Sequence, residues 1–478
     1  MPVGLHNSLM LKPELLMPAG DMEKMQYAFA FGADAVYLGI PRFSLRAREN
    51  GFKKLEQVAE AIEYAHQRGK KVYVTANIFP HNSKLPSFVK YIEELLKLTR
   101  PDAWIMSDPG LIMLMLEHFQ REIVHISVQS NTLNYASVKF WQKVGARRII
   151  VSREISIPEI KEIHDACPDM ELESFVHGAI CMAYSGRCLI SNYLSSRDSN
   201  QGACTNSCRW EYKVFKKGEV QPESWQKNDN PNATKTQQGD DYIPLKDQFY
   251  LKEAERPDEL LEIDEDEHGT YLMNSKDLCA IHILDELLKA GVCSFKVEGR
   301  SKSVYYLSMV TRAYRRAIDD MMEGKPFNLE HMRDIFATSN RGFIEGFLHG
   351  NPGVSGQEFL NSSSLYSAYR FSGIIREYDV EKKLMRLEVK NPIKVNQSYE
   401  LCLPDQTLTI DVKELFNESG LPVSEIHGGV ASCWIAYPEH PGEFALLREK
   451  LNEFEMSKIA LPKATSSCDT RDSASENY

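Results

Sequence analysis

The chain has 478 residues, of which 43% are hydrophobic and 26% charged, and it carries a formal net charge of −11. These proportions describe a protein of two or three globular domains, and they exclude collagen-like, wholly disordered and small disulfide-stapled proteins. The longest apolar run, at 111–116, is far too short to cross a membrane, and residues 1–12 lack the pattern of a secretory signal. We therefore expect a cytoplasmic protein that does not engage a membrane.

Short apolar segments, each followed by a helical pattern, alternate through the first 300 residues. Strands are predicted at 14–17, 35–38, 71–76, 103–106, 123–128, 148–151, 172–176 and 294–297. Helices are predicted at 21–31, 54–68, 85–98, 111–120, 134–144, 158–166, 276–289 and 304–322. This α/β alternation favours a closed (β/α)8 barrel of the TIM type over a doubly wound open sheet.

The rest of the chain divides by composition. The expected parts are a barrel domain (11–325) that includes a cysteine loop (181–208) and a flexible insertion (215–270), a connecting helix and loop (326–365), a small β-barrel domain (366–460) and a disordered tail (461–478). Within the insertion, the acidic run at 262–267 is expected to be a solvated loop.

Four of the ten cysteines are crowded directly after the seventh predicted strand. Their spacing is Cys181-x6-Cys188-x15-Cys204-x3-Cys208. In a reducing compartment such a group favours a metal site over disulfides. Zinc sites usually contain tight C-x2-C pairs, which are absent here, whereas an iron–sulfur cluster accepts looser spacings. The spacing alone leaves an iron–sulfur cluster, a zinc site and unligated thiols open, in that order of preference.

Active sites of parallel barrels lie at the carboxyl ends of the strands. His177, after the seventh strand, is a candidate catalytic acid or base, or a donor that supports the cluster or the backbone. Glu173 is expected to share an inward face with Phe175 and His177. A buried carboxylate there needs a partner such as Arg300 or Lys296, so structural pairing and catalysis both stay open for Glu173.

Further polar residues at the strand ends are candidates for substrate binding. Arg46, Arg48 and Arg300 could clamp a dicarboxylate, because a guanidinium group binds a carboxylate through two parallel hydrogen bonds. Asn77 and Glu298 follow the third and eighth predicted strands.

The residues around the first cysteine also carry a resemblance. The stretch reads Glu173-x-Phe175-x-His177-Gly178-Ala179-Ile180-Cys181-x6-Cys188-x-Ile190-Ser191. Supporting segments are Glu14-Leu-Leu-Met-Pro-Ala-Gly20, Gly32-Ala-Asp34-Ala-Val-Tyr-Leu-Gly39, Asn274-Ser-Lys-Asp-Leu278, Phe295-Lys-Val-Glu-Gly-Arg300 and Arg341-Gly-Phe-Ile-Glu-Gly-Phe347. Spread over about 11–448, these motifs resemble the collagenase-like peptidase family of unassigned mechanism, family thirty-two, and most of all its bacterial members that hydroxylate tRNA.

The resemblance implies a prephenate-dependent enzyme that hydroxylates the wobble uridine of tRNA to 5-hydroxyuridine without molecular oxygen. It also implies a [4Fe-4S] cluster on Cys181, Cys188, Cys204 and Cys208, with prephenate as co-substrate and tRNA as partner. Other relatives hydroxylate ribosomal RNA or a ubiquinone precursor, which gives an alternative substrate. The family name suggests a peptidase instead; the sequence has no H-E-x-x-H or G-x-S-x-G motif, so Cys181 with His177 is its only local nucleophile pair.

A negatively charged chain that binds tRNA must do so through a local basic patch. The candidates are Arg312, Arg315 and Arg316 on the last barrel helix and Lys213, Lys216 and Lys217 beyond the cysteines. An ordinary solvated helix face is the alternative interpretation of the three arginines.

Overall fold

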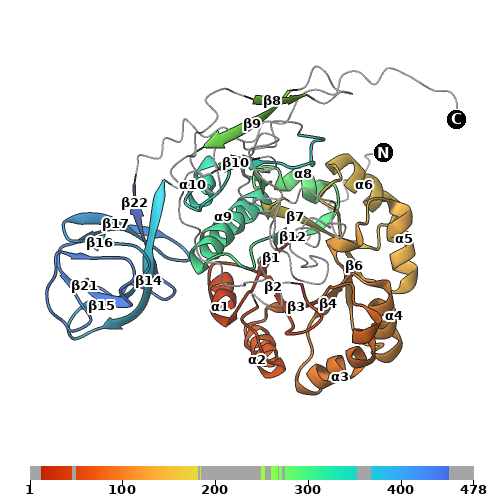
Figure 1. Cartoon of the computed structure of the whole chain (residues 1–478), viewed down its shortest axis with the longest axis horizontal. Coiled ribbons are helices and arrows are strands. Elements are labelled where there is room, and N and C mark those ends of the chain that lie inside the picture. Colours follow the sequence, from red (N-terminus) through yellow and green to blue (C-terminus); the bar gives the residue numbers. More distant parts are fainter. Residues whose placement is uncertain are drawn as a thin grey trace, which may run out of the picture.

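A computed structural model describes residues 12–45, 50–180, 184, 249–252, 260–266, 269–271, 275–352 and 368–451. The predicted barrel is confirmed (Figure 1). Its parallel strands are β1 (Glu14–Pro18), β2 (Ala35–Gly39), β3 (Lys71–Ala76), β4 (Ala103–Met106), β5 (Val124–Ile126), β6 (Arg148–Ile150), β7 (Glu171–Ala179) and β12 (Val292–Val297). The strands pair in this order, and β12 pairs with both β7 and β1, so the sheet closes on itself.

Helices surround the barrel (Figure 1). They are α1 (Met22–Ala30), α2 (Leu55–His66), α3 (Phe88–Leu98), α4 (Pro109–His118), α5 (Tyr135–Val144), α6 (Ile157–Ala166), α8 (Leu284–Lys289) and α9 (Val304–Met322), and the short α10 (Met332–Phe336) follows. Side chains cap several of their first turns. Asp21 accepts a hydrogen bond from the Lys24 amide, and Asp108 accepts one from the Leu111 amide, as N-cap residues do.

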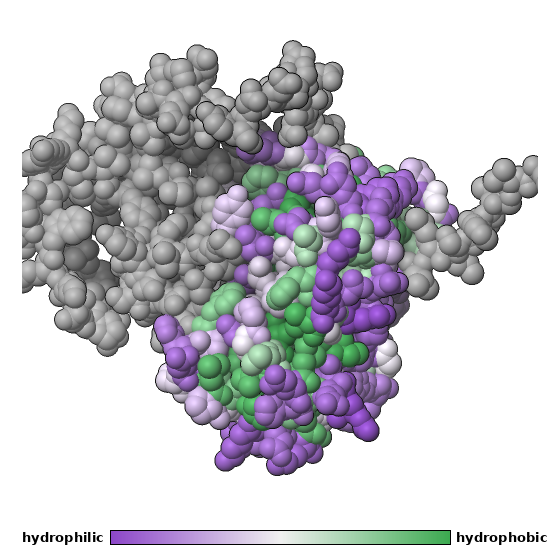
Figure 2. Space-filling model, turned by 90° about the vertical axis from the view of Figure 1, so that its right-hand side faces the viewer, coloured by the Kyte–Doolittle hydropathy of each residue, from purple (hydrophilic) through white to green (hydrophobic). Residues whose placement is uncertain are grey.

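One side of the helix layer carries apolar side chains on its surface. Figure 2 shows hydrophobic residues gathered in a band on the side of the molecule where α4, α5 and α6 lie. The helix α4 is apolar on nearly all sides, and Met113 on α4 and Phe140 on α5 are more than half exposed. No helix in the described ranges is long and apolar enough to span a membrane.

The sheet is wider than the sequence predicted. The expected helix at 276–289 is wrong in its first half, which forms β11 (Asp277–Cys279) antiparallel to β7, and β13 (Phe343–Ile344) pairs with β11 in turn. The reason is that β7 extends to Ala179, beyond the predicted end of the strand. Its last backbone groups need hydrogen-bond partners, which β11 supplies.

Part of the insertion expected to be flexible forms strands. These are β8 (Phe249–Lys252), β9 (Leu260–Asp266) and β10 (Gly269–Tyr271), which pair antiparallel. The acidic run expected as a solvated loop therefore belongs largely to β9.

The C-terminal region is all-β, as predicted. One sheet contains β14 (Tyr369–Asp379), β15 (Leu384–Val389), β17 (Gln397–Cys402), β18 (Thr407–Val412), β19 (Leu415–Phe416), β21 (Ser432–Ala436) and β22 (Leu446–Lys450), and a small second sheet contains β16 (Ile393–Lys394) and β20 (Glu425–Ile426). Alternate residues of the strands, such as Met385, Leu387 and Ile435, build a separate buried core.

A buried ion cluster joins the two domains. Arg312 of α9 forms two hydrogen bonds of 2.7 Å to the Asp334 carboxylate and donates to the carbonyls of Leu403 and Gln406 in the β domain. Arg448 of β22 approaches the same carboxylate at 3.4 Å. Although burial alone would raise the pKa of Asp334, the two guanidinium groups hold it below its usual range.

The interpretation as an exposed RNA-binding patch or a solvated face is therefore wrong for Arg312, which is buried, whereas Arg315 and Arg316 are partly exposed. Arg315 pairs with Asp34 and Asp319, and Arg316 donates to the carbonyl of Asp405. All three side chains are engaged in contacts within the protein. The candidate lysines Lys213, Lys216 and Lys217 lie outside the described residues.

Candidate functional site

Polar side chains follow one another around the carboxyl-terminal mouth of the barrel. The Ser107 hydroxyl donates to Gln129, and the Ser130 hydroxyl donates to the Ser107 carbonyl. The Ser152 hydroxyl donates to Asn131, at the next strand ends along the sheet. These hydrogen bonds link the ends of β4, β5 and β6 into a polar rim, which is where barrel enzymes place their chemistry.

Two predicted substrate-binding residues converge on Leu45. The Asn77 side-chain carbonyl accepts from the Leu45 amide at 3.1 Å, and the Arg300 guanidinium donates to the Leu45 carbonyl. Arg300 also reaches the hydroxyls of Ser44 (3.2 Å) and Thr75 (3.3 Å). Leu45 directly precedes Arg46, so Arg300 and Asn77 fix the start of the segment that carries Arg46 and Arg48.

Ser44 and Thr75 are site residues that sequence reasoning missed. Their hydroxyls lie 2.6 Å apart, and both side chains are buried. Thr75 lies on β3, two residues before Asn77. Because alternate residues of a strand face the same side, the predicted role of Asn77 could have pointed to Thr75 as well. Ser44 lies in a loop, where no such period applies.

Glu298 lies beside the end of β7. Its amide donates to the His177 carbonyl at 2.9 Å, and its own carbonyl accepts from the Tyr306 hydroxyl. Gly178 has φ of +110°, and a Cβ added there would lie 2.8 Å from both the Glu298 Cβ and the Glu298 carbonyl oxygen. A glycine is therefore required where β7 passes the segment that carries Glu298.

His177 does not share the inward face of Glu173 and Phe175, which corrects that expectation. The register between β7 and β12 shifts between Phe175 and His177, which is the signature of a bulge, and a bulge reverses which side of a strand a residue faces. The ring is 1% exposed and contacts Tyr306 and Tyr314 of α9. His177 thus lies behind the barrel wall, under α9.

The environment of His177 keeps its imidazole neutral. Burial lowers the pKa of His177 to about 4. The Tyr314 hydroxyl lies 3.3 Å from Nδ1 and donates to the Val176 carbonyl at 2.7 Å. Of the two sequence-based roles, this placement favours support of the backbone that leads to Cys181; a direct catalytic role stays a prediction.

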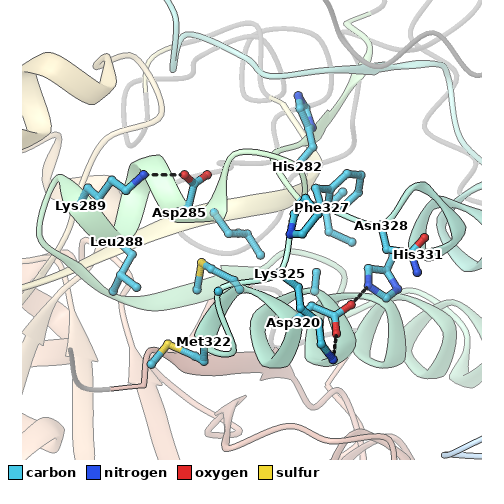
Figure 3. A pocket seen from close by; sticks show the side chains of 16 residues that line it. His282, Asp285, Leu288, Lys289, Asp320, Met322, Lys325, Phe327, Asn328 and His331 are labelled. Carbon is cyan, nitrogen blue, oxygen red and sulfur yellow. Dashed lines mark hydrogen bonds and ion pairs between the residues drawn. The ribbon is translucent and has the colours of Figure 1, made fainter. Parts of the chain in front are cut away.

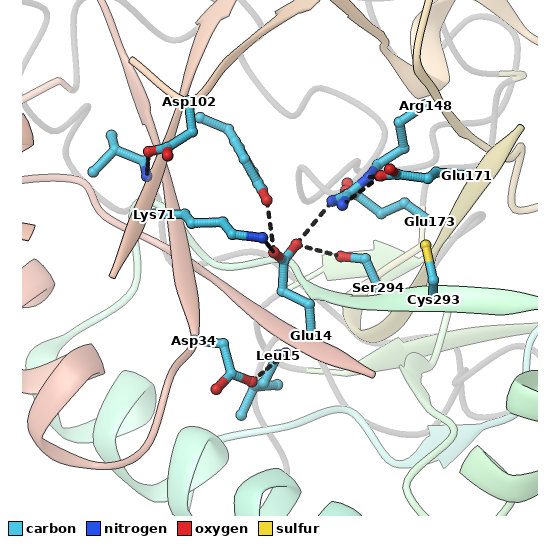
Figure 4. Close-up of polar contacts among 12 residues, drawn as sticks. Glu14, Leu15, Asp34, Lys71, Asp102, Arg148, Glu171, Glu173, Cys293 and Ser294 are labelled. Atoms are coloured by element: carbon cyan, nitrogen blue, oxygen red, sulfur yellow. Dashed lines mark hydrogen bonds and ion pairs between the residues drawn. The ribbon is translucent and has the colours of Figure 1, made fainter. Parts of the chain in front are cut away.

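Glu173 belongs to a buried charge network on the floor of the barrel (Figure 4). Its side chain is fully buried, with one carboxylate oxygen 2.7 Å from Lys296 Nζ and the other 3.1 Å from Arg148. Arg148 also pairs with Glu14 at 2.8 Å, and Tyr73 donates to the same Glu14 carboxylate. Lys296 is the predicted partner of Glu173, whereas the sequence did not point to Arg148.

The network is matched in charge. Burial would raise the pKa of Glu14, but Arg148 and the Tyr73 hydroxyl hold it below its usual range. Burial lowers the pKa of Lys296, and Glu173 opposes that shift. Every charged member has an opposite charge within hydrogen-bond distance, so these contacts support a structural role for Glu173.

Several predicted site residues lie outside the described residues: Arg46, Arg48, Cys181, Cys188, Cys204 and Cys208. The described range 50–180 ends at Ile180, directly before Cys181, and Ile180 is buried. Within the described ranges, no group of three His, Cys, Asp or Glu side chains could hold a metal ion. The thiolates of the four cysteines would be a suitable donor set for an iron–sulfur cluster.

A separate cavity of about 460 Å³ lies between α8 and α9 (Figure 3). Its acidic and basic side chains pair within the cavity, Asp285 with Lys289 and Asp320 with Lys325. Their charges therefore cancel, and the cavity has no contact with the predicted site residues named above.

With the fold and site in place, comparison with known sequences defines the class. Residues 20–358 match Peptidase family U32, and residues 367–448 match the Peptidase family U32 C-terminal domain. The chain belongs to this family, as the motifs around Cys181 indicated.

Particular relatives are similar over most of the chain. The chain is 45% identical to "tRNA hydroxylation protein P" of Escherichia coli (strain K12), over 90% of this chain and 95% of that protein. It is 43% identical to the protein of the same name from Haemophilus influenzae, over 92% and 96% of the two chains. It is also 33% identical to "23S rRNA 5-hydroxycytidine C2501 synthase" of Escherichia coli, over 65% of this chain and 40% of that protein.

Proposed function

We propose that this protein is an RNA-hydroxylating enzyme that converts the wobble uridine of tRNA to 5-hydroxyuridine, with prephenate as co-substrate and an iron–sulfur cluster as cofactor. The observation that carries the proposal is the 45% identity, along almost the full length of both chains, to a protein named for tRNA hydroxylation. The polar rim of the barrel supports it, since such a rim is where a barrel enzyme acts.

The chemistry requires more than the side chains of the described site. Carbon 5 of uridine is not acidic, so the insertion of oxygen there is a redox reaction that needs a cofactor. A cluster held by Cys181, Cys188, Cys204 and Cys208 would supply electron transfer beside the end of β7. Arg46 and Arg48 would bind the two carboxylates of prephenate, in a loop whose start Arg300 and Asn77 hold in place.

The decisive measurement is the nucleoside content of tRNA from a strain that lacks this gene. We expect 5-hydroxyuridine-derived nucleosides to disappear by mass spectrometry, to return with the wild-type gene and to stay absent with Cys181→Ser. Cys293→Ser is the matched control, because the Cys293 thiol only donates to the Leu172 carbonyl, which a serine hydroxyl can replace. Unchanged tRNA nucleosides would refute the proposal, and loss of a hydroxylated ribosomal nucleoside instead would redirect it to rRNA.

The cofactor and co-substrate are tested on purified protein. Anaerobically prepared protein should be coloured and contain iron and sulfide, and it should hydroxylate unmodified tRNA only when prephenate is added, with or without oxygen. A colourless protein that contains zinc or no metal would refute the cluster. Peptide cleavage that depends on Cys181 would favour the peptidase alternative.

A further inference from the structure

A groove of about 350 Å³ opens between the barrel and the β domain. One wall is the start of α9 with the residues before it, and the other is the start of β14 with a neighbouring loop. We call this the interdomain groove, lined by Lys302, Ser303, Tyr305, Tyr306, Ala337, Thr338, Ser339, Tyr369, Arg370, Phe371, Asn391 and Leu451.

The interdomain groove carries an exposed cationic side chain, Lys302. Its lining contains two cationic side chains, Lys302 and Arg370, and no carboxylate. Lys302 is exposed, with its ammonium group 5.3 Å from the Tyr306 ring, and Arg370 pairs with the buried Glu449. The cavity between α8 and α9 differs, because both of its lysines pair with aspartates, whereas Lys302 of the groove lies against the Tyr306 ring. The groove is therefore suited to an anionic ligand.

The groove also contains an aromatic platform. The Phe371 ring stacks on the Tyr305 ring, with centroids 4.6 Å apart and an interplanar angle of 13°. Phe371 is partly exposed, whereas Tyr305 is buried beneath it. Cationic side chains beside an aromatic ring are the combination by which proteins hold single-stranded nucleic acid, through phosphates and stacked bases.

The groove lies next to the barrel mouth along the chain. Lys302 is two residues from Arg300, so their Cα atoms are at most about 7 Å apart. Arg300 in turn contacts the loop that precedes Arg46. An RNA strand with one base at the mouth therefore has its neighbouring nucleotides within reach of the groove.

We propose that the interdomain groove binds the nucleotides that flank the modified base of the RNA substrate, with Lys302 at a phosphate and Phe371 against a base. This inference rests on the proposed function and adds the surface that selects a single-stranded loop. The β domain thereby contributes directly to RNA binding.

The test measures binding of an unmodified tRNA transcript to the full-length protein at several salt concentrations. Lys302→Gln should weaken binding several-fold and reduce the slope of log affinity against log salt by about one phosphate contact. The matched control Lys289→Gln removes the same charge from the cavity between α8 and α9 and should bind as the wild type does. Phe371→Leu, which keeps an apolar side chain on Tyr305, should weaken binding by up to about tenfold with an unchanged salt slope.

The outcomes separate this inference from the proposed function. If Lys302→Gln and Phe371→Leu bind tRNA as the wild type does, while the gene still restores tRNA hydroxylation in the deletion strain, the groove is not the RNA surface and the proposed function stands. Equal weakening by Lys289→Gln would also overturn the inference, because the effect would then be one of net charge. If the deletion strain keeps its hydroxylated nucleosides and the wild type binds no tRNA, both proposals fail.

Discussion

His177 belongs to the sequence motif around Cys181, but its buried imidazole has a structural environment. Its pKa is about 4 in the folded protein and about 6.5 in an unfolded chain, so the unfolded state binds more protons between these values. The free energy of unfolding should therefore fall as the pH drops from 6.5 towards 4, by up to about 3 kcal/mol for this group.

The prediction is tested with His177→Phe, which places an aromatic ring among Tyr306 and Tyr314. Urea unfolding between about pH 7 and pH 5 should show a weaker loss of stability in the variant than in the wild type. His125, whose pKa burial also lowers, contributes equally to both proteins. The same pH dependence in both would show that His177 does not titrate as a buried group.

At the level of elements, the end of β7 leads directly to Cys181 in the sequence. Gly178→Ala should destabilise the protein by about 1–3 kcal/mol, because the added Cβ meets Glu298 and the backbone has a positive φ. It should also lower the iron content of purified protein, since Gly178 is three residues from Cys181. Thermal unfolding and iron analysis give the two readouts.

Gly324→Ala is the control for this prediction. Gly324 also has a positive φ, at +72°, but a Cβ there meets no atom within 4 Å. Gly324→Ala should lower the free energy of unfolding only through the strain of the positive φ, and it should leave the iron content unchanged. Equal iron loss in both variants would mean that the effect comes from general instability rather than from the end of β7.

The observed helices and strands show which parts of the fold could be predicted from sequence patterns. The eight strands and α9 follow from apolar runs and helical periodicity, which depend on neighbours close in the chain. The pairing of β11 with β7 could not be predicted this way, because it depends on how far β7 extends. The bulge that turns His177 outward could not be predicted for the same reason, because the register of β7 against β12 depends on strands that are far apart in sequence.

For the whole molecule, the buried Asp334 carboxylate lies where the two domains meet. Asp334→Asn removes the negative charge shared by Arg312 and Arg448, and it should destabilise the protein by about 3–5 kcal/mol. Asp405→Asn is the control, because Asp405 is exposed and contacts Arg316 through its backbone carbonyl, and it should change stability by less than about 0.5 kcal/mol.

Chemical denaturation of the full-length chain measures both variants. Similar stabilities of the two variants would contradict the role of Asp334 at the domain junction.

The sequence suggested the α9 arginines as an exposed patch because charge runs usually face solvent. The burial of Arg312 could not be predicted, since it requires the β domain to lie against α9.

The buried charge network on the floor of the barrel restricts which substitutions this sequence can accept. Replacing Glu173 alone removes the carboxylate that pairs with Lys296, and replacing Lys296 alone leaves Glu173 with Arg148, which Glu14 shares, so each single change leaves the buried network unbalanced in charge. Only a simultaneous exchange of partners avoids such an intermediate. Related sequences should therefore either retain Glu14, Arg148, Glu173 and Lys296 together or replace them together, so that these positions covary as one inherited unit.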